Sequence, residues 1–298
     1  MTCTLSVVTV NYNGLKDTCS LIDSIPFNDK TEVIVVDNGS TADEAAIISQ
    51  RYPQVKTIRS EKNLGFAGGN NLGIKAATGS YLFLVNNDTF FKVFDVRPII
   101  KRMESSERIA IVCPKIRFAW EPQPIQFAGY SPLSSITLRN RSIGFNEPDN
   151  GQYDTPHPTP YAHGAAMMVS RKALERVGLM PESYFLYYEE LDWSMMFRRA
   201  GYDIWYDPSC TIYHKESQTT GADSPLKTYY ITRNRFLFAH RNIGGAKRYL
   251  TYSYLLTVVG LRDLCRHLLS GRTDLARATL RGIKEFYCAT RSIHYDND

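Results

Sequence analysis

Three clusters of Asn, Asp, Gly and Ser follow short apolar segments near the N-terminus. They are Asn11–Gly14 after Leu5–Val10, Asp37–Ser40 after Glu32–Val36, and Asn86–Asp88 after Tyr81–Val85. Carboxylate and amide oxygens can hold a divalent metal, and a metal can neutralise a diphosphate leaving group. One such cluster alone is more typical of a turn or a helix N-cap. Three clusters that meet at the carboxyl edge of a parallel sheet would instead make a nucleotide or metal site.

A second acidic group lies later in the chain, at Glu189, Glu190 and Asp192. A hydroxyl that attacks an anomeric carbon must lose its proton, and a carboxylate can serve as the base. On a helix, Glu189 and Asp192 share a face, whereas Glu190 points about a quarter-turn aside. Helix geometry does not choose between Glu189 and Glu190. Acidic residues in the first turn of a helix also interact favourably with its dipole, which is the alternative reading.

The elements that would position these groups alternate between strand and helix. Val55–Ile58 is a further strand-like segment, and the helix-like segments are Leu15–Ile25, Ala42–Arg51 and Phe66–Ala77. Apolar strands alternating with helices predict an α/β fold, with a mainly parallel, Rossmann-like sheet that is flanked by helices.

The middle of the chain, about residues 114–160, is rich in Pro, Asn and Ser and lacks a helical period. We expect irregular strands and a long loop there, and loops of that length often bind ligands. The predicted helices after it are Arg171–Val177, Glu189–Ala200 and Leu226–Arg241, and the predicted strands are Gly164–Val169, Asp203–Tyr206 and Thr211–Tyr213.

The C-terminal segment is basic. Residues 247–291 hold nine Lys or Arg and three Asp or Glu, whereas the net charge of the whole chain is only +5. From Ala246 onward we predict two basic amphipathic helices, broken near Ser270-Gly271. We therefore divide the chain into a catalytic domain, 1–242, and a helical extension, 243–298. The extension would suit an anionic membrane surface, but a solvated face, packing on the catalytic domain or a homodimer interface are alternatives.

The cysteines, at positions 3, 19, 113, 210, 265 and 288, form no Cys-x-x-Cys pair. We interpret them as buried or free thiols in a reducing compartment. The N-terminus lacks the basic start and apolar run of a signal peptide. The apolar window Tyr249–Leu261 has 13 residues, whereas a membrane span needs about 20. These features predict a cytoplasmic protein, peripheral at the inner face of the cell membrane.

A set of motifs resembles the family 2 glycosyltransferases, which have the GT-A fold. The matching segments are Val7–Gly14, Val35–Ser40, Asn63–Asn71, Leu84–Thr89, Gly164–Val169 and Tyr187–Trp193, with Arg198 and Gly201. They occur in the family's order over about residues 4–240. The nearest subgroup is similar to rhamnosyltransferases that build surface polysaccharides. The chain lacks the Gln-x-x-Arg-Trp motif of the processive members, so the resemblance implies addition of a single sugar.

The resemblance also implies roles for individual residues. Glu190 stands where the family has its base, with Glu189 and Asp192 beside it. Asp88 is the only carboxylate at the metal position, where Asn86 replaces the family's first Asp, and His214 is implied as a second metal ligand. The residues implied to bind the nucleotide sugar are Thr9, Asn11, Tyr12, Asp37, Asn38, Gly68, Asn71, Asn86, Asn87 and Arg233.

The implied activity is inverting transfer of a sugar from a nucleoside-diphosphate sugar to a hydroxyl, with Mg²⁺ or Mn²⁺. A dTDP- or UDP-sugar is favoured as donor and a glycan or lipid-linked molecule as acceptor, with no nucleic-acid partner. A sugar nucleotidylyltransferase is one alternative, although Asn11–Gly14 replaces the Gly-rich loop with Arg and Lys expected there. The other is a catalytically degenerate homologue that binds a nucleotide sugar, which Asn86 would suit.

Overall fold

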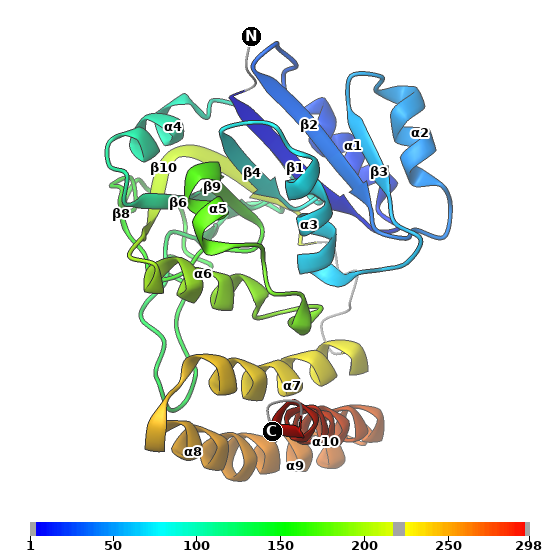
Figure 1. Cartoon of the computed structure of the whole chain (residues 1–298), viewed down its shortest axis with the longest axis vertical. Helices are drawn as coiled ribbons and strands as arrows, with labels where there is room; N and C mark the ends of the chain where they lie inside the picture. The colour runs from blue at the N-terminus through cyan, green and yellow to red at the C-terminus, as the bar shows by residue number, and fades with distance from the viewer. Residues whose placement is uncertain (1–3, 217–223, 296–298) are drawn as a thin grey trace. The chain divides into compact units, whose positions relative to one another are not determined.

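The computed structural model describes residues 4–216 and 224–295, and side chains as far as residue 288. The chain forms two compact units (Figure 1). The first contains Met1–Pro132, Arg141–Glu182 and Glu189–Ser217, and the second contains Leu133–Asn140, Ser183–Tyr188 and Gln218–Asp298. The domain boundary between residues 242 and 243 stays a prediction. Helix α7, Pro225–Asn242, lies in the second unit.

The first unit is built on a sheet with the strand order β3-β2-β1-β4-β9-β6-β10-β5. Four parallel strands form one side of it, and helices connect them: β1 (Leu5–Asn11), α1 (Leu15–Asp23), β2 (Thr31–Asp37), α2 (Glu44–Arg51), β3 (Lys56–Arg59), α3 (Gly65–Ala76) and β4 (Tyr81–Val85). Asn11 pairs with Asp37 across β1 and β2, so two of the polar strand ends lie side by side. The predicted α/β alternation is confirmed here.

Beyond β4 the sheet becomes mixed. Strand β9 (Ala166–Ser170) runs antiparallel to both β4 and β6 (Ile109–Phe118), and β6 runs parallel to β10 (Asp203–His214). Short strands complete it: β5 (Thr89–Phe90), β7 (Ile125–Phe127) and β8 (His157–Pro158). The remaining helices of this unit are α4 (Arg97–Glu104), α5 (Arg171–Val177) and α6 (Glu189–Arg199).

Two expectations about the strands were wrong. Asp203–Tyr206 and Thr211–Tyr213 belong to one strand, β10, whose pairing with β6 shifts between Asp207 and Thr211. Residues 114–118 fall in the segment expected to hold irregular strands and a long loop, and they complete the ten-residue strand β6. The proline at position 114 obscured this strand, because proline cannot donate to a β-ladder and is uncommon in a central strand.

Helix α3 lies unusually close to β1. A Cβ atom added to Gly73 would lie 2.3 Å from Val8 Cγ1, and one added to Gly69 would lie 2.7 Å from Val10 Cγ1. Protein interiors are close-packed, so larger side chains would push the helix off the sheet. Gly69 and Gly73 therefore allow α3 to pack closely on the sheet, whether or not the backbone here also approaches a sugar donor.

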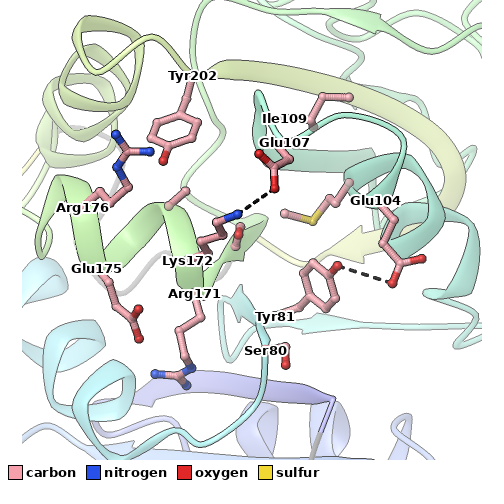
Figure 2. Close-up of a pocket in the computed structure, with 13 residues that line it drawn as sticks. Ser80, Tyr81, Glu104, Glu107, Ile109, Arg171, Lys172, Glu175, Arg176 and Tyr202 are labelled. Atoms are coloured by element: carbon pink, nitrogen blue, oxygen red, sulfur yellow. Dashed lines mark hydrogen bonds and ion pairs between the residues drawn. The ribbon is translucent and has the colours of Figure 1, made fainter.

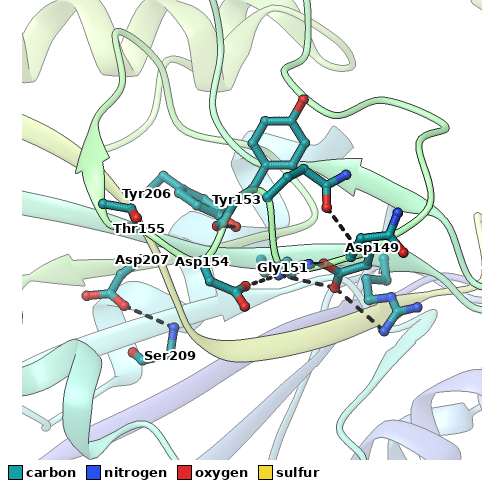
Figure 3. A network of polar contacts seen from close by, with 12 residues as sticks. Asp149, Gly151, Tyr153, Asp154, Thr155, Tyr206, Asp207 and Ser209 are labelled. Carbon is teal, nitrogen blue, oxygen red and sulfur yellow. Dashed lines mark hydrogen bonds and ion pairs between the residues drawn. The ribbon is translucent and has the colours of Figure 1, made fainter.

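The middle segment is anchored to the sheet by a polar network (Figure 3). Lys115 on β6, only 4% exposed, donates to Asp149 Oδ1 (3.0 Å) and to Asp154. The hydroxyl of Tyr206 on β10 donates to the carbonyl of Tyr153 (2.9 Å). Because a buried ammonium is costly without partners, the two carboxylates fix this loop on the first unit.

The second unit is helical: α7 is followed by α8 (Gly245–Ser253), a π-helical stretch (Tyr254–Gly260), α9 (Leu261–Leu269) and α10 (Thr273–Tyr295). The predicted break near Ser270-Gly271 is confirmed. Helices α7 and α10 approach closely at Gly282, where an added Cβ would lie 2.8 Å from the Tyr229 carbonyl oxygen. Within residues 4–216 and 224–295, no helix has the length and hydropathy that crossing a bilayer requires.

Among the described cysteines none forms a disulfide: Cys19, Cys113 and Cys210 are buried, and Cys265 and Cys288 are exposed. Cys3 lies outside the described residues.

Candidate active site

The ends of β1 and β4 are joined by a chain of hydrogen bonds through α1. Thr18 Oγ1 donates to Asn11 Oδ1 (2.6 Å), and Asn87 Nδ2 donates to Thr18 Oγ1 (3.1 Å). Asn11 Nδ2 in turn donates to Glu44 Oε2 (2.6 Å). Asn11 is fully buried. The structure therefore shows Asn11 and Asn87 holding the strand ends in place.

The end of β2 is organised in the same way. Asp37, fully buried, accepts hydrogen bonds from the backbone N–H groups of Ser40 (3.1 Å) and Ala45 (3.3 Å). Asn38, 2% exposed, bonds on both sides of its amide to the turn at residues 63–65. Asp37 and Asn38 thus use these hydrogen bonds to hold the loops at the strand end. Their contact with a nucleotide stays a prediction.

Asn71 on α3 connects that helix to the chain before the acidic helix. Its Nδ2 donates to the Met180 carbonyl (2.9 Å) and to Glu182 Oε1 (2.8 Å), and its Oδ1 accepts from Met180 N (3.1 Å). At Gly68 an added Cβ would lie 2.6 Å from Leu64 Cβ. Both residues thus shape the backbone beside the sheet edge.

Other predicted residues at this edge keep polar or aromatic groups that a ligand could use. The hydroxyl of Thr9 is buried and has no hydrogen-bond partner among the described residues. The side chain of Tyr12 is 39% exposed. Asn86 is half-buried, and its backbone N–H donates to the Ala165 carbonyl (2.9 Å). A ligand could therefore reach the ring of Tyr12 and the side chain of Asn86, whereas the Thr9 hydroxyl is enclosed.

Asp88 and His214 form a close pair at the end of the sheet. His214 Nε2 lies 3.1 Å from Asp88 Oδ1, and both residues are buried. On the other side of the ring, Nδ1 lies 2.8 Å from Gln126 Oε1. When Nδ1–H donates to that amide oxygen, Nε2 keeps its lone pair, which is the form that binds a metal. The backbone N–H of Lys215 donates to the Asp88 carbonyl (2.9 Å) and fixes the two segments together.

The geometry of this pair fits one divalent ion. Two ligands at about 2.1 Å from a metal and at right angles to each other lie about 3.0 Å apart. Over the described residues, no group of three or more His, Cys, Asp and Glu side chains could hold a metal. An ion at Asp88 and His214 would therefore take its other ligands from a diphosphate and water.

The acidic helix α6 presents its three carboxyl groups differently. Glu189 is 2% exposed and Asp192 is fully buried, whereas Glu190 is partly exposed. Burial raises the pKa of Glu190 from 4.5 to about 6, although the backbone N–H groups of Glu190 and Leu191 act in the opposite direction. A carboxylate that is accessible and has a raised pKa is the better general base. Glu190 and Glu189 thus differ in exposure, and the role of Glu190 as the base stays a prediction.

The surroundings of Glu190 include residues that the sequence did not single out. Burial, and then the charge of Glu190, raises the pKa of Tyr130. The Tyr130 ring stacks on His163, with centroids 5.9 Å apart and planes inclined by 11°. Burial, with a smaller effect of His214, lowers the pKa of His163 to about 3, so this imidazole is neutral. His163 directly precedes the recognised Gly164 motif, which is the one signal that pointed to it.

Glu190, the predicted base, lies close to the strand ends within the first unit. A Cβ atom added to Gly164 would lie 3.8 Å from both Glu190 Cδ and Phe66 Cζ. The next residue, Ala165, accepts the hydrogen bond from Asn86. The backbone of Gly164 and Ala165 therefore lies between the Glu190 side chain and the Asn86–Asp88 segment.

Arg233 lies in the second unit. Its Nη2 donates to the carbonyls of Ser183 (2.9 Å) and Tyr184 (2.7 Å), and its Nε donates to Asn234 Oδ1 (2.9 Å). These contacts give Arg233 a structural use, and its contact with a diphosphate stays a prediction.

A depression of about 550 Å³ lies at the other edge of the sheet (Figure 2). It is lined by Tyr81, where β4 begins, and by Arg171, where α5 begins. Lys172 pairs with Glu107 (2.7 Å), and Arg171 donates to two backbone carbonyls. Ligands of α/β sheets bind beyond the carboxyl ends of the parallel strands, so this depression is not the candidate site.

Parallel strands ending in Asn and Asp, continued by antiparallel strands that lead to an acidic helix, are the architecture of GT-A glycosyltransferases. Solved structures with this fold resemble the chain. GalNAc-T7 with UDP, GalNAc and Mn²⁺ has a TM-score of 0.61 at 15% identity, over 89% of this chain and 58% of its own. The mannosyltransferase PcManGT of Pyrobaculum calidifontis, in complex with GDP-Man and Mn²⁺, has a TM-score of 0.56 at 15% identity, over 93% of this chain and 74% of its own.

The chain belongs to glycosyltransferase family 2, because the family profile described as Glycosyl transferase family 2 matches residues 6–178. The Haloferax volcanii low-salt glycan biosynthesis hexosyltransferase Agl10 is 30% identical over 241 residues, which cover 78% of this chain and 74% of that protein. The Mycobacterium tuberculosis N-acetylglucosaminyl-diphospho-decaprenol L-rhamnosyltransferase is 25% identical over 308 residues, covering 95% and 98%. The predicted GT-A fold, family and sugar transfer in glycan synthesis are confirmed.

Proposed function

We propose that this glycosyltransferase inverts the anomeric centre and uses a divalent metal. In this proposal a sugar moves from a nucleoside-diphosphate sugar to a hydroxyl of a glycan or lipid-linked acceptor. The observation that carries the proposal is the partly exposed carboxyl of Glu190, whose pKa is raised to about 6. Glu190 lies in the same unit as the Asp88–His214 pair. It is close to Gly164, and the next residue, Ala165, accepts a hydrogen bond from the backbone of Asn86.

The chemistry follows from the charges of these groups. The acceptor oxygen forms a bond to the anomeric carbon as the bond from that carbon to the diphosphate oxygen breaks. The Glu190 carboxylate receives the acceptor proton, and attack from the face opposite the leaving group inverts the centre. Above pH 6 most of this carboxyl is ionised and ready to accept the proton. His163 and Tyr130, both uncharged, would give the sugar acceptor a neutral contact surface near Glu190.

Asp88 and His214 would hold the ion, which we propose to be Mg²⁺ or Mn²⁺. When bound, the ion supplies positive charge to the departing diphosphate. The chain prepares for it by directing Nε2 toward Asp88 through the contact between Nδ1 and Gln126. The Mn²⁺ complexes of GalNAc-T7 and PcManGT agree with this choice of ion.

For the substrates we propose a dTDP- or UDP-sugar donor and a lipid-linked acceptor. The M. tuberculosis relative, which covers nearly the whole chain, is by its name a rhamnosyltransferase acting on a lipid diphosphate. The exposed ring of Tyr12 at the end of β1 is suited to stack on a nucleobase.

The direct test is transfer from a panel of nucleotide sugars, with Mn²⁺ or with a chelator, to a synthetic lipid-diphosphate sugar. We expect product from one pyrimidine donor only with metal, and proton NMR should show inversion of the anomeric configuration. Glu190→Gln should abolish transfer while nucleoside-diphosphate binding persists, and Glu175→Gln, an exposed Glu on α5, is the control. Transfer that retains configuration would refute the mechanism. Nucleotide binding without transfer by the unaltered protein would favour a degenerate homologue.

We also propose that the protein works on an anionic membrane at the inner face of the cell membrane. Helix α9 has no buried residue, and Leu269 is 90% exposed. Basic side chains, among them the exposed Arg262 and Arg266, lie between the apolar ones. Apolar side chains beside cations match an interface of acyl chains and anionic headgroups. The exposed large apolar residues of this surface are Tyr249, Leu250, Leu256, Val258, Leu261, Leu268 and Leu269.

Sedimentation with vesicles tests the membrane surface. The protein should bind vesicles containing phosphatidylglycerol and not vesicles of phosphatidylcholine alone. Leu268→Glu with Leu269→Glu should remove this binding, whereas Val93→Glu, a change at another exposed apolar residue (75% exposed), should not. If the double variant keeps full binding, the surface is wrongly assigned. A shift from dimer to monomer with unchanged vesicle binding would assign the face to a second copy of the chain.

A further inference from the structure

The chain leaves the first unit just before the acidic helix and returns to it at Glu189. The six residues between, Ser183–Tyr188, belong to the second unit, and we name them the hook. Within it, Phe185, Tyr187 and Tyr188 have φ angles of 65°, 70° and 78°. This left-handed region is unfavourable for residues with a Cβ atom, and aromatic residues seldom adopt it. Three such residues persist only where surrounding contacts enforce them.

One side chain on α7 contacts three carbonyls of the hook. Asn234, fully buried, donates through Nδ2 to the carbonyls of Tyr184 (3.0 Å), Leu186 (2.7 Å) and Tyr187 (2.9 Å). An amide nitrogen has two hydrogens, so the three carbonyls share them. They converge on one point only because the backbone of the hook curls around it.

The neighbouring residue, Arg233, also binds the hook. Arg233 binds the Ser183 and Tyr184 carbonyls through Nη2, and its Nε donates to Asn234 Oδ1, which orients the amide so that Nδ2 faces the hook. Further along α7, Arg235 Nε lies 3.2 Å from the hydroxyl of Tyr188. The carbonyls that α7 binds span most of the hook.

The residues on both sides of the hook are fixed in the first unit. On its N-terminal side, Asn71 binds Met180 and Glu182 within the first unit. On its C-terminal side, Tyr188 is followed at once by Glu189 and Glu190, the first residues of α6. Displacing the hook backbone would therefore displace the start of the helix that carries the base.

We propose that Arg233 and Asn234 are positioning residues for the catalytic base. They hold the hook in its left-handed conformation, and the hook sets where α6 begins and where the Glu190 carboxyl points. The inference rests on the proposed function of Glu190 and replaces the diphosphate contact predicted for Arg233. A misplacement of about 1 Å can cost about 100-fold in rate, so a backbone clamp of this kind matters for catalysis.

The test compares Asn234→Ala and Arg233→Lys with Asn242→Ala in the full chain. Asn242 is the matched control, because it is on the same helix but donates to a carbonyl of that helix, at Phe238. We expect Asn234→Ala to lower kcat about 100-fold, with the Kd for the nucleoside diphosphate as in Asn242→Ala, and to lower the Tm more than Asn242→Ala does, because three hook carbonyls lose their buried donor. The acid limb of the kcat/KM profile should move to lower pH as the Glu190 carboxyl becomes more hydrated. Arg233→Lys should lower kcat in the same way and leave the Kd unchanged.

Hydrogen–deuterium exchange gives a readout that does not need activity. In Asn234→Ala the amides of residues 184–191 should exchange faster, and those of α3 should not change. An unchanged kcat, or unchanged exchange in the hook, overturns the proposal. A rise in the nucleoside-diphosphate Kd with Arg233→Lys, at unchanged kcat, restores the diphosphate role instead. If the unaltered protein transfers no sugar from any donor, the proposed function fails, while the exchange result still decides whether Asn234 holds the hook.

Discussion

Replacing Glu190 by Gln should abolish catalysis and stabilise the fold at the same time. Burial raises the pKa of this carboxyl from 4.5 to about 6. At 1.36 kcal/mol for each tenfold change in the protonation equilibrium, holding it ionised costs the folded state about 2 kcal/mol. Gln has nearly the same shape and no charge, so the variant is free of this cost.

The sign of the pH dependence follows from linkage. The folded protein holds the Glu190 proton more tightly than the unfolded chain, so the carboxyl favours folding less as the pH rises through 6. At pH 8 the whole cost of about 2 kcal/mol is present, and at pH 4.5 only a small part of it remains. The variant should therefore gain stability at pH 8 and almost none at pH 4.5. The unaltered enzyme should lose about tenfold in kcat/KM between pH 7 and pH 5, because its base becomes protonated.

Thermal unfolding at pH 8 and pH 4.5 measures this difference. In domains of 150–250 residues, 1 kcal/mol moves Tm by about 2–4 °C, so Glu190→Gln should raise Tm by roughly 4 °C or more at pH 8. Glu175→Gln, at an exposed position on α5, should leave Tm unchanged at both values. Equal Tm values for Glu190→Gln and the parent at pH 8 would refute the burial argument. Retained transfer activity would refute the assignment of the base.

Three further predictions concern the metal, the helix–sheet contact and the middle segment. His214→Ala removes one of the two proposed ligands and should raise the Mn²⁺ concentration for half-maximal transfer more than about tenfold; an unchanged metal titration would argue against this site. Gly73→Ala would bring a Cβ atom to 2.3 Å from a methyl carbon of β1, which should cost about 1–3 kcal/mol in urea unfolding; a neutral result would mean that α3 shifts easily. Lys115→Met leaves the Asp149 carboxylate, 12% exposed, without its ammonium and should cost about 3 kcal/mol; adding Asp149→Asn should recover part of that loss, and no recovery would contradict the ion-pair account.

The parallel half of the sheet could be predicted because each signal there is local. The apolar segments of β1, β2 and β4 are buried on both faces, and each is followed directly by its polar cluster. The strand ends then meet for topological reasons alone, as the pairing of Asn11 with Asp37 shows. The pairing of Asp88 with His214 needed more, because the two residues are far apart in sequence, and the family resemblance supplied their association.

The features that the sequence did not reveal depend on long-range contacts. Strand β6 contains a proline that a local rule counts against it, and it is stable because β9 and β10 pair with it on both sides. The left-handed residues of the hook are aromatic, so no turn-forming glycine or asparagine marked them. Tyr130, which the charge of Glu190 affects, and His163, which stacks on Tyr130, are far from α6 in the sequence, so no local pattern connected them with Glu190.

The asparagines of the motifs show why a polar residue at a strand end need not touch a ligand. Asn11, Asn38 and Asn71 are at most 2% exposed, and the amide of each one both donates and accepts hydrogen bonds within the first unit. A buried amide bonded on both sides fixes two segments of backbone at once. The chain thus uses its buried amides to set the positions of the strand ends. We therefore expect the exposed ring of Tyr12 and the partly exposed carboxyl of Glu190, rather than these amides, to contact the substrates.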